Sequence, residues 1–447
     1  MADRVSELLR DIPDSPVGRQ LRWDLTMRIT EGEGASLDDQ ARFAPALAST
    51  AWKGVETLEQ LREIWRGAAK RIGEIVSVSV ESASEFSAKA LFATSNGRKW
   101  TLSIDVEPAP PHRMTRWEIE RQHEFQLDVR EAGEADAAIL ADIERRCPIV
   151  LGETEVYFDR GDDYLAFSRL MEDCTIGIAS VDGVPAAVSC GAKHTVRVGG
   201  VLRPIMTVSH LRVLPEHQRK GLWGAANRAL NKYWPVVDGS NAYISEDNAG
   251  MRHGFANTPN KWDVPVLRMQ LPCAALAGPA AGRPATAADA ETIVGLLNAF
   301  HGAEEMFVPY TAASLTARLE RAPAQYAWDK IWLADGALVG VWPAGDSLRV
   351  VSQTRGVRTE SVRGVVLDYA FAPGAEAAFE ALLRAWCGWL AARGMDRLSI
   401  FSSPPSPGAD VLRALAGEVE AFTMWTPGID APADADRHGL YVDPIYF

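Results

Sequence analysis

The sequence has few cysteines, no long apolar run and no excess of positive charge. Its five cysteines are scattered over 447 residues and never form a C-x-x-C pair, which excludes a disulfide framework and a zinc cage. No run of about 18 apolar residues could cross a bilayer, and the first residues, MADRVSELLRDIPD, are too acidic for a signal peptide. We therefore expect a cytoplasmic protein with reduced core thiols, no metal and no membrane partner.

Acidic residues outnumber basic ones, 59 to 46, and the net charge is −13. A field of this sign repels polyanions, so nucleic acid is not an expected partner, and any anionic ligand has to be held by local groups. The hydrophobic content of 47% with 23% charged residues is typical of globular proteins. A chain of this length is expected to form two to four domains of roughly 100 to 200 residues.

Residues 1–113 are predicted to form the first domain. Helical segments are expected at 17–29, from the Ser36 cap and at 57–72, where Leu58, Leu61, Ile64 and Trp65 recur at helical spacing. Three stretches of alternating polarity follow, and the Asn96-Gly97 pair between the last two is a strong hairpin signal. This order of helices and strands resembles the cone of the steroid-isomerase (nuclear-transport-factor) family, as do LRWDL at 21–25 and WTLSIDVEPAPP at 100–111. No short catalytic motif accompanies the resemblance.

Residues 114–128 are expected to connect this domain to a second one at 129–273. Its pattern predicts a strand end and helix at 129–147, a second helix at 159–171, and strands at 174–183, 184–200 and 202–213 joined by Asp-Gly and Gly-Gly turns. A small-residue linker is expected at 274–285. The same layout then starts again, which predicts a second copy of the domain at 283–447.

One loop after the strand 202–213 carries most of the chemical information. It reads LPEHQRKGLWGAANRAL from Leu214, a cationic turn with two glycines that runs into a helix. A helix N-terminus offers unpaired N–H groups and partial positive charge, and a glycine lets a bulky anion approach the backbone, so a pyrophosphate is the expected guest. The loop fits neither a Walker nor a Rossmann pattern.

The loop resembles the signature of the GNAT superfamily of acyl-CoA N-acyltransferases, Q/R-x-x-G-x-G/A after a strand and a V-x-P loop. Val213, Pro215, Gln218 and Gly221 match it, whereas Trp223 stands at the last position and Gly224 follows one step later. The resemblance implies an α+β chain with an N-terminal cone of helices and antiparallel sheet followed by two GNAT-fold α/β domains, the first of which binds acetyl-CoA or another acyl-CoA and acylates the amine of a small metabolite. It implies a CoA site made of Leu211, Val213, Gln218, Arg219, Lys220, Gly221, Leu222, Trp223, Gly224 and Asn248.

The second copy lacks this signature. Its corresponding stretch, FAPGAEAAF at 371–379, has no cationic flank and places Glu376 where a phosphate would lie. Because a carboxylate there repels CoA, this copy is expected to be catalytically silent and to help form the acceptor pocket.

The residues that move protons are harder to assign. Alternation along TVSHLRV places Thr207, Ser209, Leu211 and Val213 on one face and His210 on the other unless a bulge intervenes. Ser209 is therefore the candidate catalytic residue, holding a water that relays a proton. The tyrosine that usually meets the leaving thiolate in this family is replaced by Phe255, and Tyr243 lies nearby in sequence.

Two rival functions remain open at this point. A non-catalytic acyl-CoA sensor or scaffold fits the unassigned base and the missing tyrosine. An isomerase or hydratase site inside the first domain would need a buried acid, for which Asp24, Glu74 and Asp105 are available. The acceptor cannot be read from the sequence, which also leaves a homodimer open.

Overall fold

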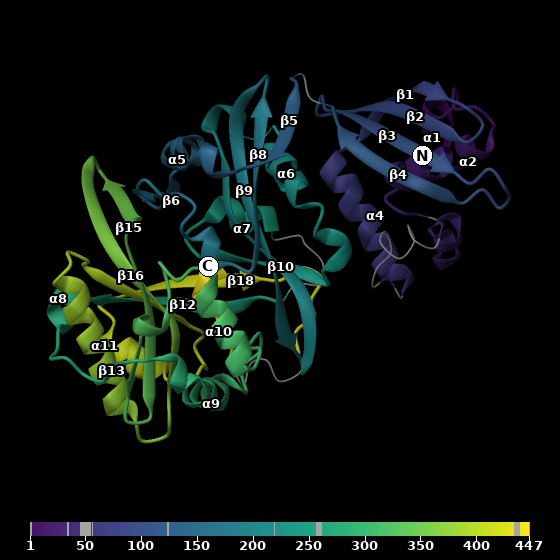
Figure 1. Ribbon diagram of the computed structural model, residues 1–447. Coiled ribbons are helices and arrows are strands. Elements are labelled where there is room, and N and C mark those ends of the chain that lie inside the picture. The colour runs from purple at the N-terminus through teal and green to yellow at the C-terminus, as the bar shows by residue number, and fades with distance from the viewer. Residues whose placement is uncertain are drawn as a thin grey trace. The chain divides into compact units, whose positions relative to one another are not determined.

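The computed structural model describes residues 2–33, 35–44, 55, 57–122, 125–218, 220–255, 262–432 and 439–446. Within them the chain forms two compact units, Met1–Gln126 and Leu127–Phe447 (Figure 1). Each unit is described by itself below.

The first unit packs helices against one face of a four-stranded antiparallel sheet with the order β1-β2-β3-β4. Leu61 and Trp65 of the last helix are fully buried, as their helical spacing predicts. The turn at Asn96-Gly97 joins β2 to β3, with Gly97 at φ 78°. The elements are α1 (Ala2–Leu8), α2 (Pro16–Ile29), the 3-10 helix η1 (Leu37–Arg42), α4 (Leu58–Ile72), β1 (Ile75–Ala83), β2 (Ser87–Thr94), β3 (Lys99–Val106) and β4 (Met114–Arg121).

Two expectations for this unit are corrected. The expected connector 114–128 contains β4, which pairs with β3 from Trp100 to Val106, so the unit runs to Gln126 rather than to 113. Alternating residues such as Trp117 and Ile119 pack on the core, and this burial makes the segment a strand. The helix expected from Ser36 is only the short 3-10 helix η1.

The second unit begins with a run of strands and short helices. Its first part contains β5 (Leu127–Glu131), α5 (Ala137–Arg146), β6 (Ile149–Leu151), β7 (Thr154–Asp159), β8 (Asp173–Val181), β9 (Val184–Val198), β10 (Val201–Val213), α6 (Leu222–Ala226), β11 (Gly239–Ser245), α7 (Ala249–Phe255), β12 (Val264–Pro272) and α8 (Cys273–Leu276). Its second part contains β13 (Arg283–Pro284), α9 (Ala290–His301), α10 (Ala312–Arg321), β14 (Ile331–Ala334), β15 (Ala337–Thr354), β16 (Val357–Phe371), α11 (Glu376–Ala391), β17 (Arg397–Ser402), α12 (Ala409–Leu415), β18 (Glu418–Trp425) and the 3-10 helix η9 (Pro444–Tyr446).

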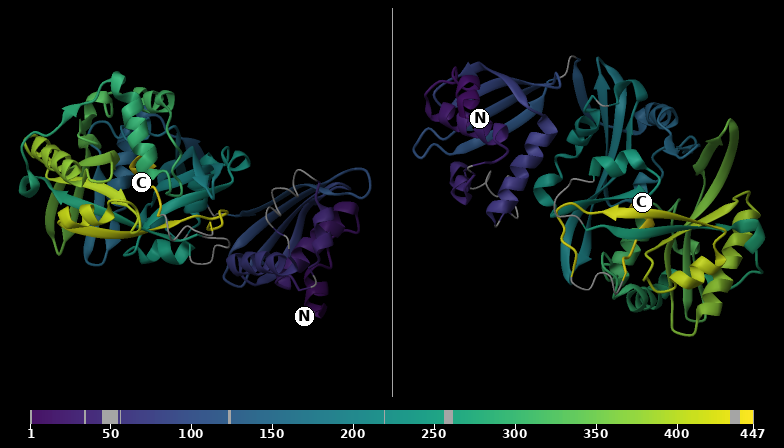
Figure 2. Two further views of the ribbon diagram at one scale, coloured as in Figure 1. Left: turned by 90° about the horizontal axis from the view of Figure 1, so that it is seen from below. Right: turned by 180° about the vertical axis from the view of Figure 1, so that it is seen from behind.

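These strands join into one sheet with the order β13-β14-β15-β16-β17-β12-β18-β11-β10-β9-β8-β5. Strand β12 comes from the first part of the unit but pairs with β17 and β18 of the second part. Strand β18 in turn pairs with β11 of the first part. Figures 1 and 2 show the teal β12 beside the yellow β18. Because each part supplies a strand that the other needs, residues 129–273 and 283–447 share one sheet.

The two parts repeat one detail of strand pairing. In each, a long antiparallel hairpin (β9 with β10, β15 with β16) is followed by a strand that runs parallel to its second member for only three residue pairs. Helix α11 covers the second part with apolar residues at helical spacing, namely Phe379, Leu382, Leu383, Trp386 and Leu390. The unit is therefore a mixed α/β structure, in agreement with the expected fold class.

Two further expectations for this unit are corrected. The helix expected at 159–171 does not form, and that stretch holds turns and the 3-10 helix η3 (Ser168–Leu170) after the hairpin β6–β7. Pairing of β7 with β15 and burial of Arg160 and Phe167 fix this irregular path. The linker expected at 274–285 packs against α11, where the Gly278 N–H donates to the Arg384 carbonyl at 3.0 Å. All five cysteines are free thiols.

Candidate functional site

The candidate site lies where β10 and β11 separate. The two strands are parallel neighbours only at Ile205–Thr207, paired with Gly239–Asn241. From Ala242 onward β11 pairs with β18 instead. Among the described residues, the later half of β10 (208–213) therefore has a strand on its β9 side alone. An edge of this kind leaves backbone N–H and C=O groups available to a ligand. Two of its carbonyls already have partners, because the Leu211 C=O accepts from the Arg212 guanidinium at 3.0 Å and the Val213 C=O accepts from the Gln218 amide at 3.3 Å.

A β-bulge interrupts β10 at the same place. Its register with β9 shifts between Ser209 and Arg212, and His210 has a positive φ of 51°. A residue inserted into a strand reverses the alternation of side chains beyond it. As a result Ser209 and His210 both line the same cavity, and the expectation that His210 points away from it is wrong.

His210 is fixed by contacts on three sides. The Arg160 guanidinium donates to its Nε2, its Nδ1 lies 2.9 Å from the Ser209 hydroxyl, and the Phe167 ring stacks on it at 4.3 Å between centroids. Because arginine can only donate, Nε2 accepts and Nδ1 carries the proton that is donated to Ser209. Burial, followed by the charges of Arg160 and Arg212, holds the pKa of His210 well below its usual value. The imidazole is therefore neutral, and the lone pair of its unprotonated Nε2 accepts the hydrogen bond from Arg160.

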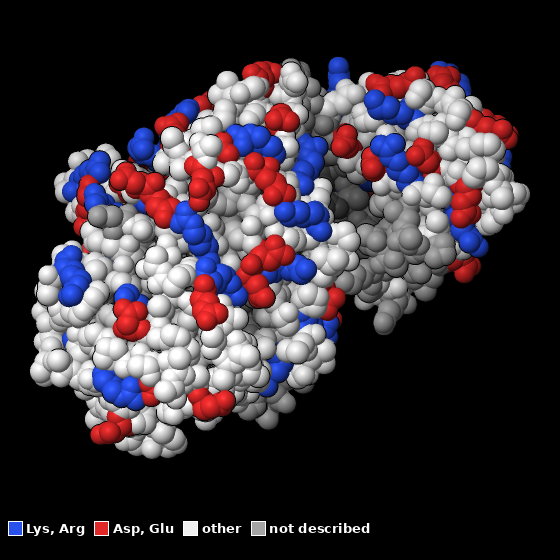
Figure 3. Space-filling model, in the orientation of Figure 1, with Lys and Arg blue, Asp and Glu red and all other residues white. Residues whose placement is uncertain are grey.

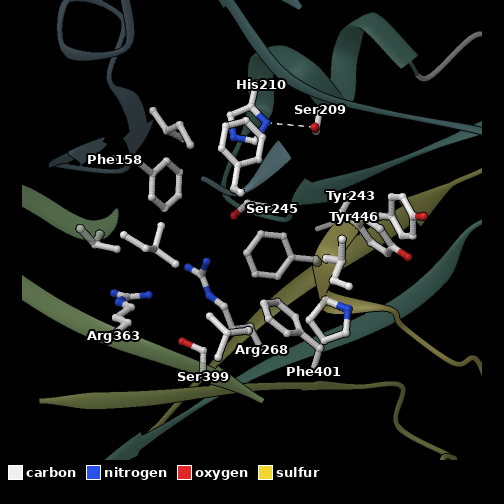
Figure 4. Close-up of a pocket in the computed structure, with 18 of the residues that line it drawn as sticks. Phe158, Ser209, His210, Tyr243, Ser245, Arg268, Arg363, Ser399, Phe401 and Tyr446 are labelled. Carbon is white, nitrogen blue, oxygen red and sulfur yellow. Dashed lines mark hydrogen bonds between the residues drawn. The ribbon is translucent and has the colours of Figure 1, made fainter. Parts of the chain in front are cut away.

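We call the space in front of these residues the central cavity. Its volume is about 220 Å³, and it extends from β10 and β11 to β12, β15, β16 and β17 of the second part. Figure 4 shows Ser209 and His210 on one side of it and Arg268, Arg363 and Ser399 on the other. Most of its lining is apolar, including Phe158, Phe167, Val208, Trp342, Leu348, Val350, Val365, Phe401 and Phe422.

Tyr243 and Tyr446 separate the central cavity from a second one. Both tyrosines line both spaces, and the second, which we call the polar cavity, has a volume of about 410 Å³. Its lining includes Glu172, His194, Asn241, Tyr310, Arg318 and Asp443. Burial raises the pKa of Tyr243 above its usual value, so its hydroxyl stays protonated and able to donate near neutral pH. The sequence placed Tyr243 on this strand without assigning it a role.

The loop after β10 departs in part from the expected helix start. The chain makes the 3-10 helix η4 (Pro215–His217) and passes through Gly221, which has φ 85°. Helix α6 then lasts only five residues and continues as a 3-10 turn, so a long helix dipole is absent and backbone N–H groups are the main attraction for an anion.

The loop residues differ in what they present to a ligand. Lys220, Gly221 and Gly224 are exposed, and Trp223 is 41% exposed. Leu222 is buried and can offer only its backbone. The Gln218 amide donates to the Val213 carbonyl at 3.3 Å and ties the loop to the end of β10. Arg219 lies outside the described residues.

The structure gives Asn248 a role in the chain itself. Its side-chain oxygen accepts a hydrogen bond from the Met251 N–H at 3.1 Å, so it caps α7. Asn248 does not line the central cavity. The side chain of Phe255 lies outside what the structure describes.

The corresponding turn of the second part has the opposite charge, as expected. Helix α11 begins at Glu376, whose carboxylate accepts from the Gly374 N–H at 3.3 Å. On the face drawn in Figure 3, basic and acidic side chains are interspersed, so individual residues have to supply any countercharge.

Sequence reasoning missed three of the four arginines that line the central cavity. Arg160, Arg268 and Arg363 come from segments far apart in the chain and are brought together by the shared sheet. No spacing rule connects them, because their meeting depends on the exchange of β12 and β18.

The rival site in the first unit is not supported. Asp24 is fully buried, but it is paired with Arg28 at 2.7 Å and accepts from the Trp117 indole at 2.8 Å. Glu74 is exposed and paired with Arg4, and Asp105 lies on the polar face of the sheet with Ser87 and Arg116. The three carboxylates do not share an interior site.

No protein-family model matches the chain, and no curated protein matches it in sequence. Among solved structures, N-myristoyltransferase from Saccharomyces cerevisiae with bound myristoyl-CoA is similar with a TM-score of 0.51 at 10% identity, covering 75% of this chain and 87% of that one. GCN5-related N-acetyltransferases from Sphaerobacter thermophilus and Kribbella flavida match at 15% and 13% identity, cover 68% of this chain and 97% and 71% of theirs, and have TM-scores of 0.41 and 0.36.

The similarity to N-myristoyltransferase is a similarity of fold, since one residue in ten is identical. The TM-scores of the two acetyltransferases are too low to carry an argument. None of the described helices is long and apolar enough to cross a membrane, and no group of three metal-ligating side chains occurs in the part of the chain that the structure describes. The similarity that carries weight is that of the mixed α/β fold, which this chain shares with N-myristoyltransferase.

Proposed function

We propose that this protein is an acyl-CoA-dependent N-acyltransferase that acts on the amine of a small molecule. The observation that carries the proposal is the separation of β10 from β11 beside a bulge, with the unpaired strand edge ending next to the central cavity. Such an edge can bind the amides of pantetheine, and the cavity can hold the reacting groups away from water.

The expected placement of acyl-CoA follows from the order of elements along β10. The thioester lies at Ser209, pantetheine runs along Leu211 and Val213, and the pyrophosphate reaches the exposed loop at Lys220–Gly224. The N–H groups after Gly221, with Lys220 and Arg219, supply donors and countercharge. That the similarly folded N-myristoyltransferase was crystallised with myristoyl-CoA supports an acyl-CoA co-substrate. We take acetyl-CoA as the simplest donor.

The reaction itself needs only modest help from side chains. The amine nitrogen attacks the thioester carbon, the C–N bond forms, the amine proton passes to a water held by Ser209, and the C–S bond breaks to release CoA thiolate. Arg160, hydrogen-bonded to His210, places positive charge near the oxyanion that forms on the way. Tyr243, which lines the central cavity from β11, is the candidate for protonating the thiolate, which also leaves unaided near neutral pH.

The remaining parts are assigned supporting roles. We propose that the first unit is a steroid-isomerase-like cone and that the large unit is a tandem of GNAT domains in which the second has lost its CoA site. The second domain still supplies one wall of the central cavity through Arg268, Arg363 and Phe401. We expect the protein to act in the cytoplasm.

The decisive experiment incubates the full chain with acetyl-CoA and a panel of small amines and measures thiol release. Isothermal titration calorimetry with CoA is performed on the same sample. Thiol release that depends on one amine supports the proposal. Tight CoA binding with no turnover of any amine would favour the alternative, a non-catalytic acyl-CoA sensor or scaffold. Absence of both binding and turnover would overturn the CoA site.

A further inference from the structure

The central cavity has an unusual balance of charge. Of the residues that the structure describes, four arginines line it, Arg160, Arg212, Arg268 and Arg363, and no aspartate, glutamate or lysine does. The remaining lining is mostly apolar. A guanidinium placed in apolar surroundings loses hydration, and that cost is recovered only if an anion or several acceptors face it.

Two of the four arginines are paired with carboxylates that lie outside the cavity. Arg212 donates to Glu144 at 2.8 Å, and Arg268 forms a two-point contact with Glu420. Both carboxylates lie outside the cavity lining. These two arginines therefore form part of the cavity wall with their charges already paired.

Arg160 has no carboxylate partner among the described residues, and its charge is stabilised in a different way. It is 6% exposed, donates to His210 and lies over the Phe167 ring at 4.1 Å, close to the Phe158 and Tyr164 rings as well. The faces of aromatic rings attract a cation. Arg160 therefore has partners at the reacting end of the cavity.

Arg363 has no direct carboxylate partner. Among the described residues it forms no ion pair, and its hydrogen bond is a long one, from Nε to the Ser361 hydroxyl at 3.3 Å. Burial, and then the neighbouring charge of Arg268, lower its pKa to about 10, and the more distant carboxylates of Glu420, Asp396 and Glu418 oppose this shift only in part. Arg363 therefore still carries its charge at neutral pH. Figure 4 shows its side chain on the side of the cavity away from Ser209 and His210. It is thus a half-buried cation that no carboxylate of the described residues contacts directly.

We propose that Arg363 binds the carboxylate of a ligand whose apolar body fills the central cavity, with its other end at Ser209 and His210. A planar carboxylate matches the two-point donor geometry of a guanidinium. The body would pack on Phe158, Trp342, Val365 and Phe401. The inference rests on the proposed function in one respect, that the reacting end lies at the bulge of β10.

Two sources could bring this chemistry to the site. The carboxylate can belong to the acceptor, which would then be an amino carboxylate whose amine and carboxylate lie at opposite ends of an apolar body. It can also belong to the far end of the acyl chain, as in a dicarboxylic acyl-CoA. Both place the same group against Arg363, and the experiment below separates them.

The first test measures binding without turnover. Calorimetry compares 3-phenylpropionate with 3-phenylpropan-1-ol, which has the same body without the charge. We expect the acid to bind at least about tenfold more tightly, equivalent to one charged contact. The variant Arg363→Met should lose this preference, whereas the control Arg358→Met, on the same strand but exposed and paired with Glu360, should keep it. Equal binding of acid and alcohol, binding of neither, or a preference kept in Arg363→Met would overturn the proposal.

Thermal unfolding tests whether Arg363→Met loses binding only because the fold is destabilised. Because Arg363 forms no ion pair among the described residues and only a long hydrogen bond to Ser361, replacing it by methionine should leave Tm unchanged or raise it. Only the rise in Tm caused by 3-phenylpropionate should disappear. A large fall in Tm for Arg363→Met without ligand would mean that the arginine is structural, which would contradict the inference.

The source of the carboxylate is found by turnover on the same samples. Acetyl-CoA is offered with 4-(2-aminoethyl)benzoate, whose amine and carboxylate lie at opposite ends, or with phenethylamine, and succinyl-CoA is compared with acetyl-CoA at fixed phenethylamine. A preference for 4-(2-aminoethyl)benzoate identifies the acceptor as the source, and a preference for succinyl-CoA identifies the acyl chain. If CoA binds but the carboxylate probe does not, only this inference fails. If the probe binds but CoA does not, the proposed function fails and the carboxylate site remains.

Discussion

Tyr446 stacks on His194, with ring centroids 3.9 Å apart and planes 9° from parallel. The contact joins the C-terminal segment to β9, and Tyr446 also forms part of the boundary between the central and polar cavities. The 3-10 helix η9 is thus packed into the large unit, where Tyr446 and Tyr243 separate two spaces of different polarity.

Removal of the Tyr446 ring should open this boundary. Tyr446 is 6% exposed, so Tyr446→Ala deletes a buried aromatic ring and leaves a void, which should lower the free energy of unfolding by about 3 kcal/mol. Tyr446→Phe keeps the ring and should cost less than about 1 kcal/mol. Urea denaturation of the two variants checks this, and an equal effect of both would contradict the packing role.

His194 predicts how stability depends on pH. Its Nε2 lies 2.8 Å from the Thr207 hydroxyl, which donates its own proton to Asn241, so the imidazole is neutral with the proton on Nε2. Burial lowers the pKa of His194 to about 4, and Asp443 opposes the shift only in part. Between the usual value of about 6.5 and 4, the unfolded chain binds a proton that the folded chain does not.

Stability should therefore fall as the pH decreases through this window. At pH 4.5 the unprotonated His194 of the folded chain should lower the free energy of unfolding by about 2.5 kcal/mol relative to its value at pH 7. The variant His194→Gln should lose less stability than the wild type by roughly this amount when the pH is lowered from 7 to 4.5, as measured by urea denaturation. His112→Gln, in the other unit, is the control and should follow the wild type. If the free energy of unfolding depended on pH identically in wild type and His194→Gln, the histidine would have to become protonated in the folded chain as readily as in the unfolded one.

The positions of Ser209 and His210 at the bulge of β10 lead to a prediction about catalysis. Because the pKa of His210 is held well below its usual value, the imidazole does not change charge between pH 6 and 9, and log kcat/KM should show no inflection near pH 6.5. Ser209→Ala should lower kcat by about tenfold or more through loss of the water relay, with KM for acetyl-CoA within about twofold. An inflection near 6.5 that vanishes in His210→Phe would make His210 the base instead.

How far the sequence predicts this site can be judged from β10. The strand, the loop after it and the glycine at 221 follow from local patterns, and all three are present. The orientation of His210 was missed because a bulge costs little and leaves no signature in one sequence. Arg363 was missed for another reason, since its place in the cavity depends on strand exchange between distant segments. Local chemistry was thus readable, whereas the meeting of distant residues was not.

The loop proposed to bind the CoA phosphates can be tested with a substitution that does not strain the backbone. Gly221→Val would block the expected phosphate position, but φ 85° at this residue makes any side chain unfavourable. Gly224 is a cleaner site, because a Cβ there meets open space. Gly224→Val should weaken CoA binding by at least about tenfold, and Gly295→Val, on α9 with an equally open Cβ position, should change it by less than about twofold. Calorimetry in which both variants bind CoA like the wild type would rule out the loop as the phosphate site.

The last prediction compares the two turns that occupy equivalent places in the repeated layout. The turn before α6 offers exposed Lys220 and the N–H groups after Gly221, whereas the turn before α11 presents the carboxylate of Glu376, which already accepts from the Gly374 N–H. Charge reversal by Arg219→Glu with Lys220→Glu should therefore abolish CoA binding and turnover, because each like-charge contact costs on the order of 1 kcal/mol. Glu376→Gln keeps the side chain's shape and should leave turnover within about twofold. Calorimetry and thiol release on the same preparations measure both effects. If Glu376→Gln weakened CoA binding while the double reversal did not, CoA would have to bind at residues 369–380, and the active site would belong to the second part of the large unit.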